Sequence, residues 1–171
     1  MIQQVDALYK ELDKGNRRTY KDLFIARYTE LCLWLQRPVP KRIDEIADIY
    51  MTRIMFEPDP VTRYSYDTEV TRKRDRAKEA IISAPTKLQK QDELEKALRF
   101  WAQQTDQYAD IISDEATIKA FEDAGIKKVV WHTQDDEKVC VTCHERDKQS
   151  FPITKIPTKP HWRCRCWIST R

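Results

Sequence analysis

Four cysteines and one histidine crowd the C-terminal part of the chain, in the pattern Cys140-x-x-Cys143 followed by His161-x-x-Cys164-x-Cys166. A structural zinc ion takes four thiolate or imidazole ligands in a tetrahedron and keeps no water. Two groups of such ligands separated by a short loop are typical of this kind of site. The spacing therefore predicts a small module that folds around one structural zinc ion.

The pattern contains one donor more than a tetrahedral zinc ion needs. Cys140 and Cys143 are close enough to bind the metal from one turn, and a second turn must supply the other ligands. We favour Cys140, Cys143, His161 and Cys164 as the four ligands. Cys166 is the alternative to Cys164, because we expect only one of these two residues to face the metal. A site made of cysteines alone would require a tight bend between these two residues.

The cysteine content favours a metal site over disulfide bonds. The chain has five cysteines, an odd number, and four of them have metal-ligand spacing. Disulfides belong to oxidising compartments, and residues 1–12 carry charges where a secretory signal would need an unbroken apolar stretch. No run of about 18 apolar residues is present, so we expect no membrane span. Cys32 lies in an apolar run and is predicted to be a small buried residue.

Composition predicts a mostly α-helical fold. The 171 residues include only two glycines, and 35% of them are charged, which favours helices over a sheet protein with many tight turns. A chain of this length supports one moderate core and one small module. We therefore predict a helical N-terminal domain with a long helix, residues 1–125, and a small β-rich zinc-binding module, residues 126–171.

Apolar residues recur at helical spacing through much of residues 1–125. A first short helix is expected to end at Gly15, a second to run from Thr19 towards Pro38, and a third to span residues 43–54. These amphipathic helices cannot bury their apolar stripes alone, so they should pack against each other and against the helix that follows.

A long helix is predicted after Thr86. Thr86 and Gln89 have the spacing of a capping box, and a helical period of apolar residues continues to Ile112. Ser113 and the acids after it are expected to restart the helix with a new cap. Gly125 should close it in the left-handed conformation, which places the domain boundary there.

Residues 61–84 are the least readable segment. Their basic run, residues 72–76, is predicted to be a solvated helix face or loop rather than a phosphate-binding patch. In the tail, β-branched and aromatic residues favour strands at 127–133 and 166–170. We expect a sheet of two or three short strands folded around the metal.

The positive charge of the chain is concentrated in the tail. Residues 1–125 carry 21 basic and 23 acidic side chains, whereas residues 126–171 carry 10 basic and 5 acidic ones. A small module with this excess of basic side chains offers a positive surface to nucleic acid or to an acidic protein face.

The motif does not match catalytic zinc sites. Zinc deaminases place His-x-Glu before Pro-Cys-x-x-Cys, whereas Val139 precedes Cys140 here. No His-Glu-x-x-His sequence is present, and four protein donors leave no open position on the metal. We therefore expect no enzyme activity and no small-molecule substrate. His132 and His144 are predicted to be surface or core polar residues, although His144 next to Cys143 could replace a ligand.

The order of short motifs in residues 124–166 resembles one known family. The motifs are a strand with Trp131 and Thr133, then Val139-Cys140-x-x-Cys143, then Phe151-Pro152, and a closing His161-x-x-Cys164-Arg165-Cys166. This order and spacing resemble the C-terminal module of the Mu F-like head morphogenesis proteins, which are minor head proteins of tailed bacteriophages.

The resemblance implies a structural protein that is made in the host cytoplasm during head assembly and is present in the virion in few copies. It implies association with the portal or the inner capsid, and a role in head assembly or genome delivery. The implied partners are the portal protein and the major capsid protein. The basic tail adds packaged DNA as a further expected partner.

Two other classes of protein fit parts of the sequence. A zinc-ribbon nucleic-acid-binding protein would use the basic tail residues together with Trp131, Trp162 and Trp167 to contact phosphates and stack on bases. Tryptophans in so small a module are more often core residues. A nuclease or toxin effector is the third class, but no cluster of histidine with acidic residues has catalytic spacing.

Overall fold

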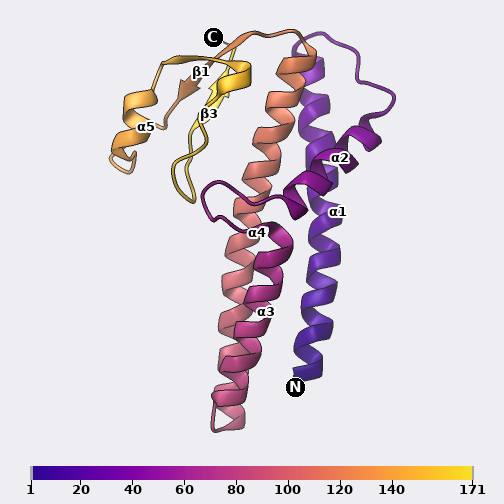
Figure 1. Ribbon diagram of the computed structural model, residues 1–171, viewed down its shortest axis with the longest axis vertical. Coiled ribbons are helices and arrows are strands. Elements are labelled where there is room, and N and C mark those ends of the chain that lie inside the picture. Colours follow the sequence, from indigo (N-terminus) through magenta and orange to yellow (C-terminus); the bar gives the residue numbers. More distant parts are fainter. Residues whose placement is uncertain (1, 171) are drawn as a thin grey trace.

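The computed structural model describes residues 2–170. Helices account for 66% of it, and a small three-stranded sheet lies near the C-terminus, which confirms the predicted fold class. Two long helices, α1 and α4, run in the same direction, and α3 runs antiparallel to them (Figure 1). No helix within residues 2–170 is long and apolar enough to cross a membrane.

Helix α1 spans Ile2–Trp34 without interruption. The prediction that one helix ends at Gly15 and another begins after Thr19 is therefore wrong. A single glycine weakens a helix but does not end it, and no proline occurs before Pro38. The buried stripe continues past Gly15, so packing against the other helices holds this segment helical. Its members are Val5, Tyr9, Tyr20, Phe24, Tyr28, Leu31 and Cys32.

Two shorter helices follow between proline-containing loops. Helix α2 spans Ile43–Phe56, close to the predicted third helix. Helix α3 spans Tyr66–Ser83 and contains the basic run. In that run Arg72 pairs with Glu69 at 2.9 Å, and the other basic side chains are partly or fully exposed, which confirms a helix face.

Helix α4 spans Lys87–Asp123 as one continuous element. The predicted capping box is confirmed, because the side chain of Thr86 accepts the Gln89 N–H and the Gln89 side chain reaches back to the Thr86 N–H. The predicted restart at Ser113 is wrong: its carbonyl accepts the Thr117 hydroxyl at 2.8 Å inside the helix. A serine has no capping role where tertiary packing continues the helix on both sides.

Gly125 ends α4 as predicted. It has φ 77°, and the Ile126 N–H donates to the Phe121 carbonyl at 3.0 Å while the Gly125 N–H donates to the Glu122 carbonyl at 2.9 Å. This pair of hydrogen bonds is a Schellman motif, which needs a left-handed residue at the position of the glycine.

The core of the helical region is aromatic. The ring of Tyr66, at the start of α3, is fully buried and lies 5.9 Å from Tyr20, 5.9 Å from Trp101 and 4.9 Å from Tyr108, measured between ring centroids. Tyr9 contacts Trp101 at 6.1 Å. These rings join α1, α3 and α4, and aromatic pairs in such tilted and edge-to-face arrangements stabilise the packing beyond the burial of their area.

The C-terminal module is built on the three-stranded antiparallel sheet. Strand β1 (Lys128–His132) lies in the centre, between β2 (Ser150–Pro152) and β3 (Trp167–Ser169). The short helix α5 (Val141–Arg146) and the 3₁₀ helix η1 (Ile153–Lys155) lie in the connections. The predicted sheet of two or three strands is confirmed.

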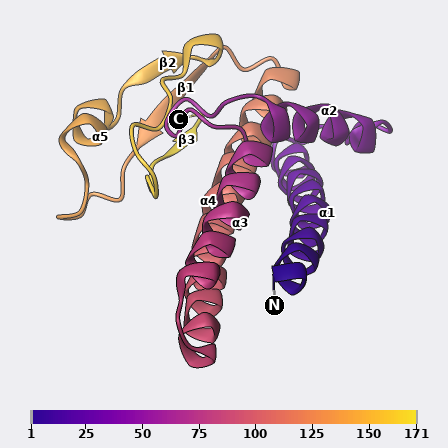
Figure 2. The same cartoon turned by 60° about the horizontal axis from the view of Figure 1, so that its bottom comes forward.

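The module lies beside the C-terminal half of α4, on the side away from α1 (Figure 1, Figure 2). Trp162 meets the ring of Tyr108 edge-on at 6.3 Å between centroids. Lys159 pairs with Asp114 at 2.7 Å, and Val129 of β1 belongs to the same buried core as the helices. Helix α4 therefore serves as the support of the module.

We expect a glycine-to-alanine substitution to have opposite effects on stability at the two glycines. Gly15→Ala should stabilise the protein by about 0.5–1 kcal/mol, because Gly15 is helical and an added Cβ has open space. Gly125→Ala should destabilise it by about 1 kcal/mol, because the left-handed backbone there strains any residue with a Cβ. Urea unfolding of both variants measures the two changes. A stabilising effect at Gly125 would contradict the assigned helix end.

Candidate metal centre

The structure brings all five predicted donors into one cluster. Two groups of three have their ligand atoms within 4.8 Å of one another, and Cys143 belongs to both groups. The first group also contains Cys140 and His161, and the second contains Cys164 and Cys166. The Cys143 Sγ lies 3.5 Å from the Cys164 Sγ and 3.9 Å from the His161 Nε2. The five side chains form a cluster that could hold a metal ion.

The first cysteine pair is held by the start of α5. Cys140 is the residue before the helix, and its Sγ accepts the backbone N–H of Cys143 at 3.4 Å. The two sulfurs lie within 4.8 Å of each other. Cys143 is 2% exposed, and Cys140 is half-buried at the edge of the cluster.

The orientation of His161 suits a metal ligand. Its Nδ1 lies 2.8 Å from the backbone carbonyl oxygen of Trp162. A carbonyl can only accept a hydrogen bond, so Nδ1 carries a proton, and the tautomer protonated at Nδ1 has its lone pair on Nε2. Nε2 is the atom that faces Cys143. In metal sites, a hydrogen bond from the other ring nitrogen to a backbone carbonyl commonly fixes the tautomer of a ligating histidine.

Cys164 and Cys166 both face the cluster, so the expectation that only one of them would do so is wrong. They lie in extended chain just before β3, where burial alternates from Arg163 to Trp167 and the two cysteines are the buried positions. Side chains two residues apart in extended chain point to the same side. Arg163, with φ 57°, makes the left-handed turn that delivers this segment.

Burial and neighbouring charges set the protonation of the thiols. Burial raises the pKa of Cys143 well above its ordinary value, and the neighbouring thiols raise it further. Burial also raises the pKa of Cys166. The pKa of Cys140 is lowered, chiefly because its thiolate accepts the Cys143 N–H. Buried thiols of this kind ionise readily only when a cation binds to them.

The distances between the sulfur atoms fit a metal site and do not fit a disulfide bond. The 3.5 Å between the Cys143 and Cys164 sulfurs is far longer than the S–S bond of about 2.05 Å, and all five cysteines are free thiols. Ligands about 2.3 Å from a tetrahedral metal lie about 3.8 Å from each other. This value applies to two sulfur ligands, and the 3.5 Å between the Cys143 and Cys164 sulfurs is close to it.

The other histidines lie outside the cluster. His132 Nε2 shares a hydrogen bond with the Ser169 hydroxyl at 2.8 Å, and its ring stacks on Trp167. His144 is exposed and belongs to neither group of donors found among residues 2–170. Both residues are therefore polar surface or packing residues, as predicted, and His144 does not replace a ligand in this arrangement.

The three tail tryptophans have different surroundings. Trp131 is 2% exposed and packs with Cys143, Cys164 and Cys166 in the core of the module. Trp162 is packed on Tyr108 of α4. Trp167 is the one of the three that is substantially exposed, at 45%. Trp131 and Trp162 are thus engaged in packing, and Trp167 has one face stacked on His132.

A glutamine of α4 supports the cluster and was missed by sequence reasoning. The Gln107 side-chain oxygen accepts the backbone N–H of Arg163 at 2.5 Å, and Gln107 is buried. It holds the turn between His161 and Cys164 from outside the module. Nothing in the sequence pattern marks Gln107, because the contact joins segments that are far apart in the chain and depends on how the module docks.

Comparisons with known proteins add no family: no family model, no curated protein and no solved structure matches this chain.

We expect the purified protein to carry a bound metal ion that depends on the cluster. Cys143→Ser should abolish binding, because this thiol belongs to both groups of donors. Cys32→Ser, at a buried cysteine of α1, is the matched control and should leave the metal content unchanged. Metal analysis by mass spectrometry measures the ratio of metal to protein. Equal metal content in the two variants would contradict the assignment.

Metal binding should strengthen as the pH rises. The raised pKa values keep the thiols of Cys143 and Cys166 protonated at neutral pH in the metal-free protein, so metal binding must displace protons. The apparent affinity should increase about tenfold per pH unit for each proton displaced. Competition with a chromophoric chelator at several pH values measures the slope, and a flat profile would exclude buried thiols as ligands.

Proposed function

We propose that the cluster binds one structural zinc ion through four of its five donors. Thiolate and imidazole are the ligands of structural zinc sites. Cys143 belongs to every arrangement, because both groups share it. Cys140, His161 and Cys164 are our preferred partners, and Cys166 is the alternative to one of them. Bound zinc would balance the charge of the thiolates and fix the two ligand-bearing turns to each other.

A structural role follows from the number of donors. Four protein ligands close a tetrahedral zinc site, so no position is left for a substrate or a reactive water. The module is small, and the buried residues of its own cluster are Trp131 and three cysteines, with a few partly buried apolar side chains packed around them. In domains of this size a metal commonly supplies the folding energy that the apolar core lacks. We therefore propose no enzyme activity for this chain.

For the whole chain we propose the role of a minor head protein of a tailed bacteriophage. One observation carries the proposal: the motifs that resemble the Mu F-like head morphogenesis proteins come together as one unit. The strand with Trp131 is the centre of the sheet, and the segment after the closing Cys164-Arg165-Cys166 pairs with it as β3. Both cysteine groups converge beside this strand.

The proposed role divides between the two parts of the chain. The long helices would present a docking surface to the portal protein or the major capsid protein. The zinc-bound module would be rigid and positively charged, with the exposed Arg163 and Arg165 close to the metal. It would contact packaged DNA or an acidic protein face. The protein would be assembled in the host cytoplasm and remain in the virion.

The packing of the tryptophans favours this function over that of a zinc ribbon that reads nucleic acid. Base stacking requires accessible rings, whereas Trp131 is buried in the module and Trp162 is packed on α4. Any contact with DNA would therefore rely on charge rather than on a row of stacked bases.

Purified phage heads test this function. We expect the chain to be a component of the heads by mass spectrometry, and heads made without it to lose infectivity. Cys143→Ser should reproduce much of the loss, because the module needs its metal, whereas Cys32→Ser should not. The proposal fails if heads that lack the chain equal wild type in assembly, DNA content and infectivity.

A further inference from the structure

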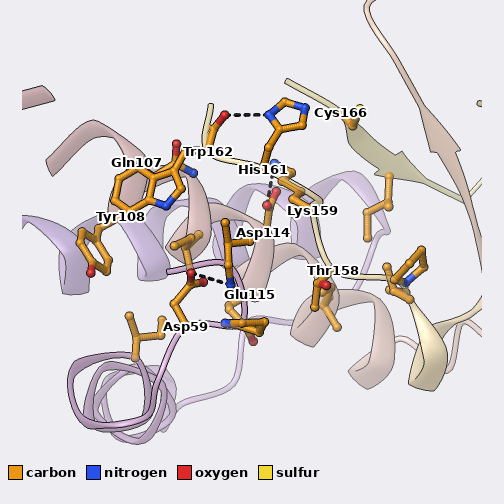
Figure 3. Close-up of a pocket in the computed structure, with 18 of the residues that line it drawn as sticks. Asp59, Gln107, Tyr108, Asp114, Glu115, Thr158, Lys159, His161, Trp162 and Cys166 are labelled. Carbon is orange, nitrogen blue, oxygen red and sulfur yellow. Dashed lines mark hydrogen bonds and ion pairs between the residues drawn. The ribbon is translucent and has the colours of Figure 1, made fainter. Parts of the chain in front are cut away.

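A pocket of about 420 Å³ lies between the helical region and the C-terminal module. Its walls come from the end of α2 and the loop after it, from the C-terminal half of α4, and from the segment that leads from η1 to β3 (Figure 3). We call it the interface pocket. Its volume lies in the range of about 300–1,000 Å³ that is typical of ligand-binding sites, which often form between domains.

The inner walls of the interface pocket are largely apolar. The main contributors are Ile54, Ile111, Ile118, Ile156, Trp162 and Ile168. They come from three separate parts of the chain, so the cavity exists only when the module is docked on α4. Such walls accept an aliphatic stem or a flat ring and exclude a fully hydrated ligand.

The charged residues of the pocket are unequally divided between acids and bases. Lys159 pairs with Asp114 at 2.7 Å, and Arg53 pairs with Glu115 (Figure 3). Within each pair the positive and the negative charge neutralise each other. Glu57 and Asp59 also line the pocket.

Glu57 and Asp59 leave the pocket with a net negative charge. Neither carboxylate forms an ion pair with any residue between 2 and 170. The Asp59 Oδ1 accepts the backbone N–H groups of Val61 at 3.0 Å and Thr62 at 2.8 Å, which fixes its position on the loop.

The acidic character continues along α4 beside the pocket. Asp106, Asp110 and Asp114 follow each other at intervals of four residues and therefore lie on one side of the helix. Burial raises the pKa of Asp110 and of Asp114, with Lys159 acting against this in both cases. Carboxylates that are partly withdrawn from water and repel each other are stabilised by a further cation.

We propose that the interface pocket binds an apolar segment of a partner protein that carries an arginine. The aliphatic stem of arginine matches the isoleucine walls, and its planar guanidinium can stack on a ring such as Trp162 and donate to the carboxylates at the rim. The charge of the pocket selects a basic partner over an acidic one. This inference does not depend on the identity of the particle or complex that contains the chain.

Peptide binding to the purified 171-residue protein tests the inference. The probe is a fluorescently labelled tripeptide, Leu-Arg-Leu, capped at both ends, and its control is the same peptide with glutamate in place of arginine. We expect the arginine peptide to bind, with an affinity that falls when salt is added. We expect the glutamate peptide not to bind. Chemical-shift changes in the protein should concentrate on the lining residues of the pocket.

Two sets of variants locate the binding. Ile111→Trp fills the apolar wall, and the double variant Glu57→Gln with Asp59→Asn removes the charge while keeping the shape and the acceptor of the loop. We expect each of these changes to lower the affinity for the arginine peptide by about tenfold. Glu11→Gln with Asp92→Asn, at exposed positions of α1 and α4 outside the pocket lining, is the matched control and should leave binding unchanged.

Several results would overturn the inference. These are the absence of binding, equal binding of the two peptides, and equal affinity of the charge-removed and control variants. Self-association of the protein that Ile111→Trp abolishes would assign the pocket to a second copy of the chain instead, and sedimentation at the titration concentrations would detect it.

Discussion

The burial of several thiols around Cys143 is the constraint on which the module depends. Burial raises the pKa of Cys143 and of Cys166, so these two thiols become thiolates readily only with a cation beside them. His161 has its tautomer fixed with the lone pair toward the same point. The surrounding sheet is short, and its edge strands have three residues each. In the proposed zinc-bound state, the folding of the module and the binding of metal would be coupled.

The module also depends on α4. Gln107 holds the backbone of the turn at Arg163, and Tyr108 packs against Trp162 one residue earlier in that turn. The helical region thus positions one of the two ligand-bearing turns directly. The same docking creates the interface pocket, whose walls belong to both parts of the chain. His161 and Cys166 line the interface pocket and also belong to the donor cluster, so the two sites share residues.

Local sequence signals were reliable where the local backbone alone decides the outcome. The capping box at Thr86 and the left-handed Gly125 are features of single turns, and both were predicted. The predicted breaks at Gly15 and Ser113 failed because a weak helix former ends a helix only when packing does not hold the flanking turns together. The geometry at Cys164 and Cys166 was misjudged, since extended chain places both on one side.

The sequence by itself determined the helical character of the chain, the position of the β-rich tail and the five donors of the cluster, because composition, periodicity and ligand spacing are local properties. Only the tertiary structure decided that α1 and α4 are continuous, that Cys143 is common to both groups of donors and that Gln107 supports the second turn. These features arise from contacts between segments far apart in the chain, and such contacts form only when the long helices pack and the module docks on α4.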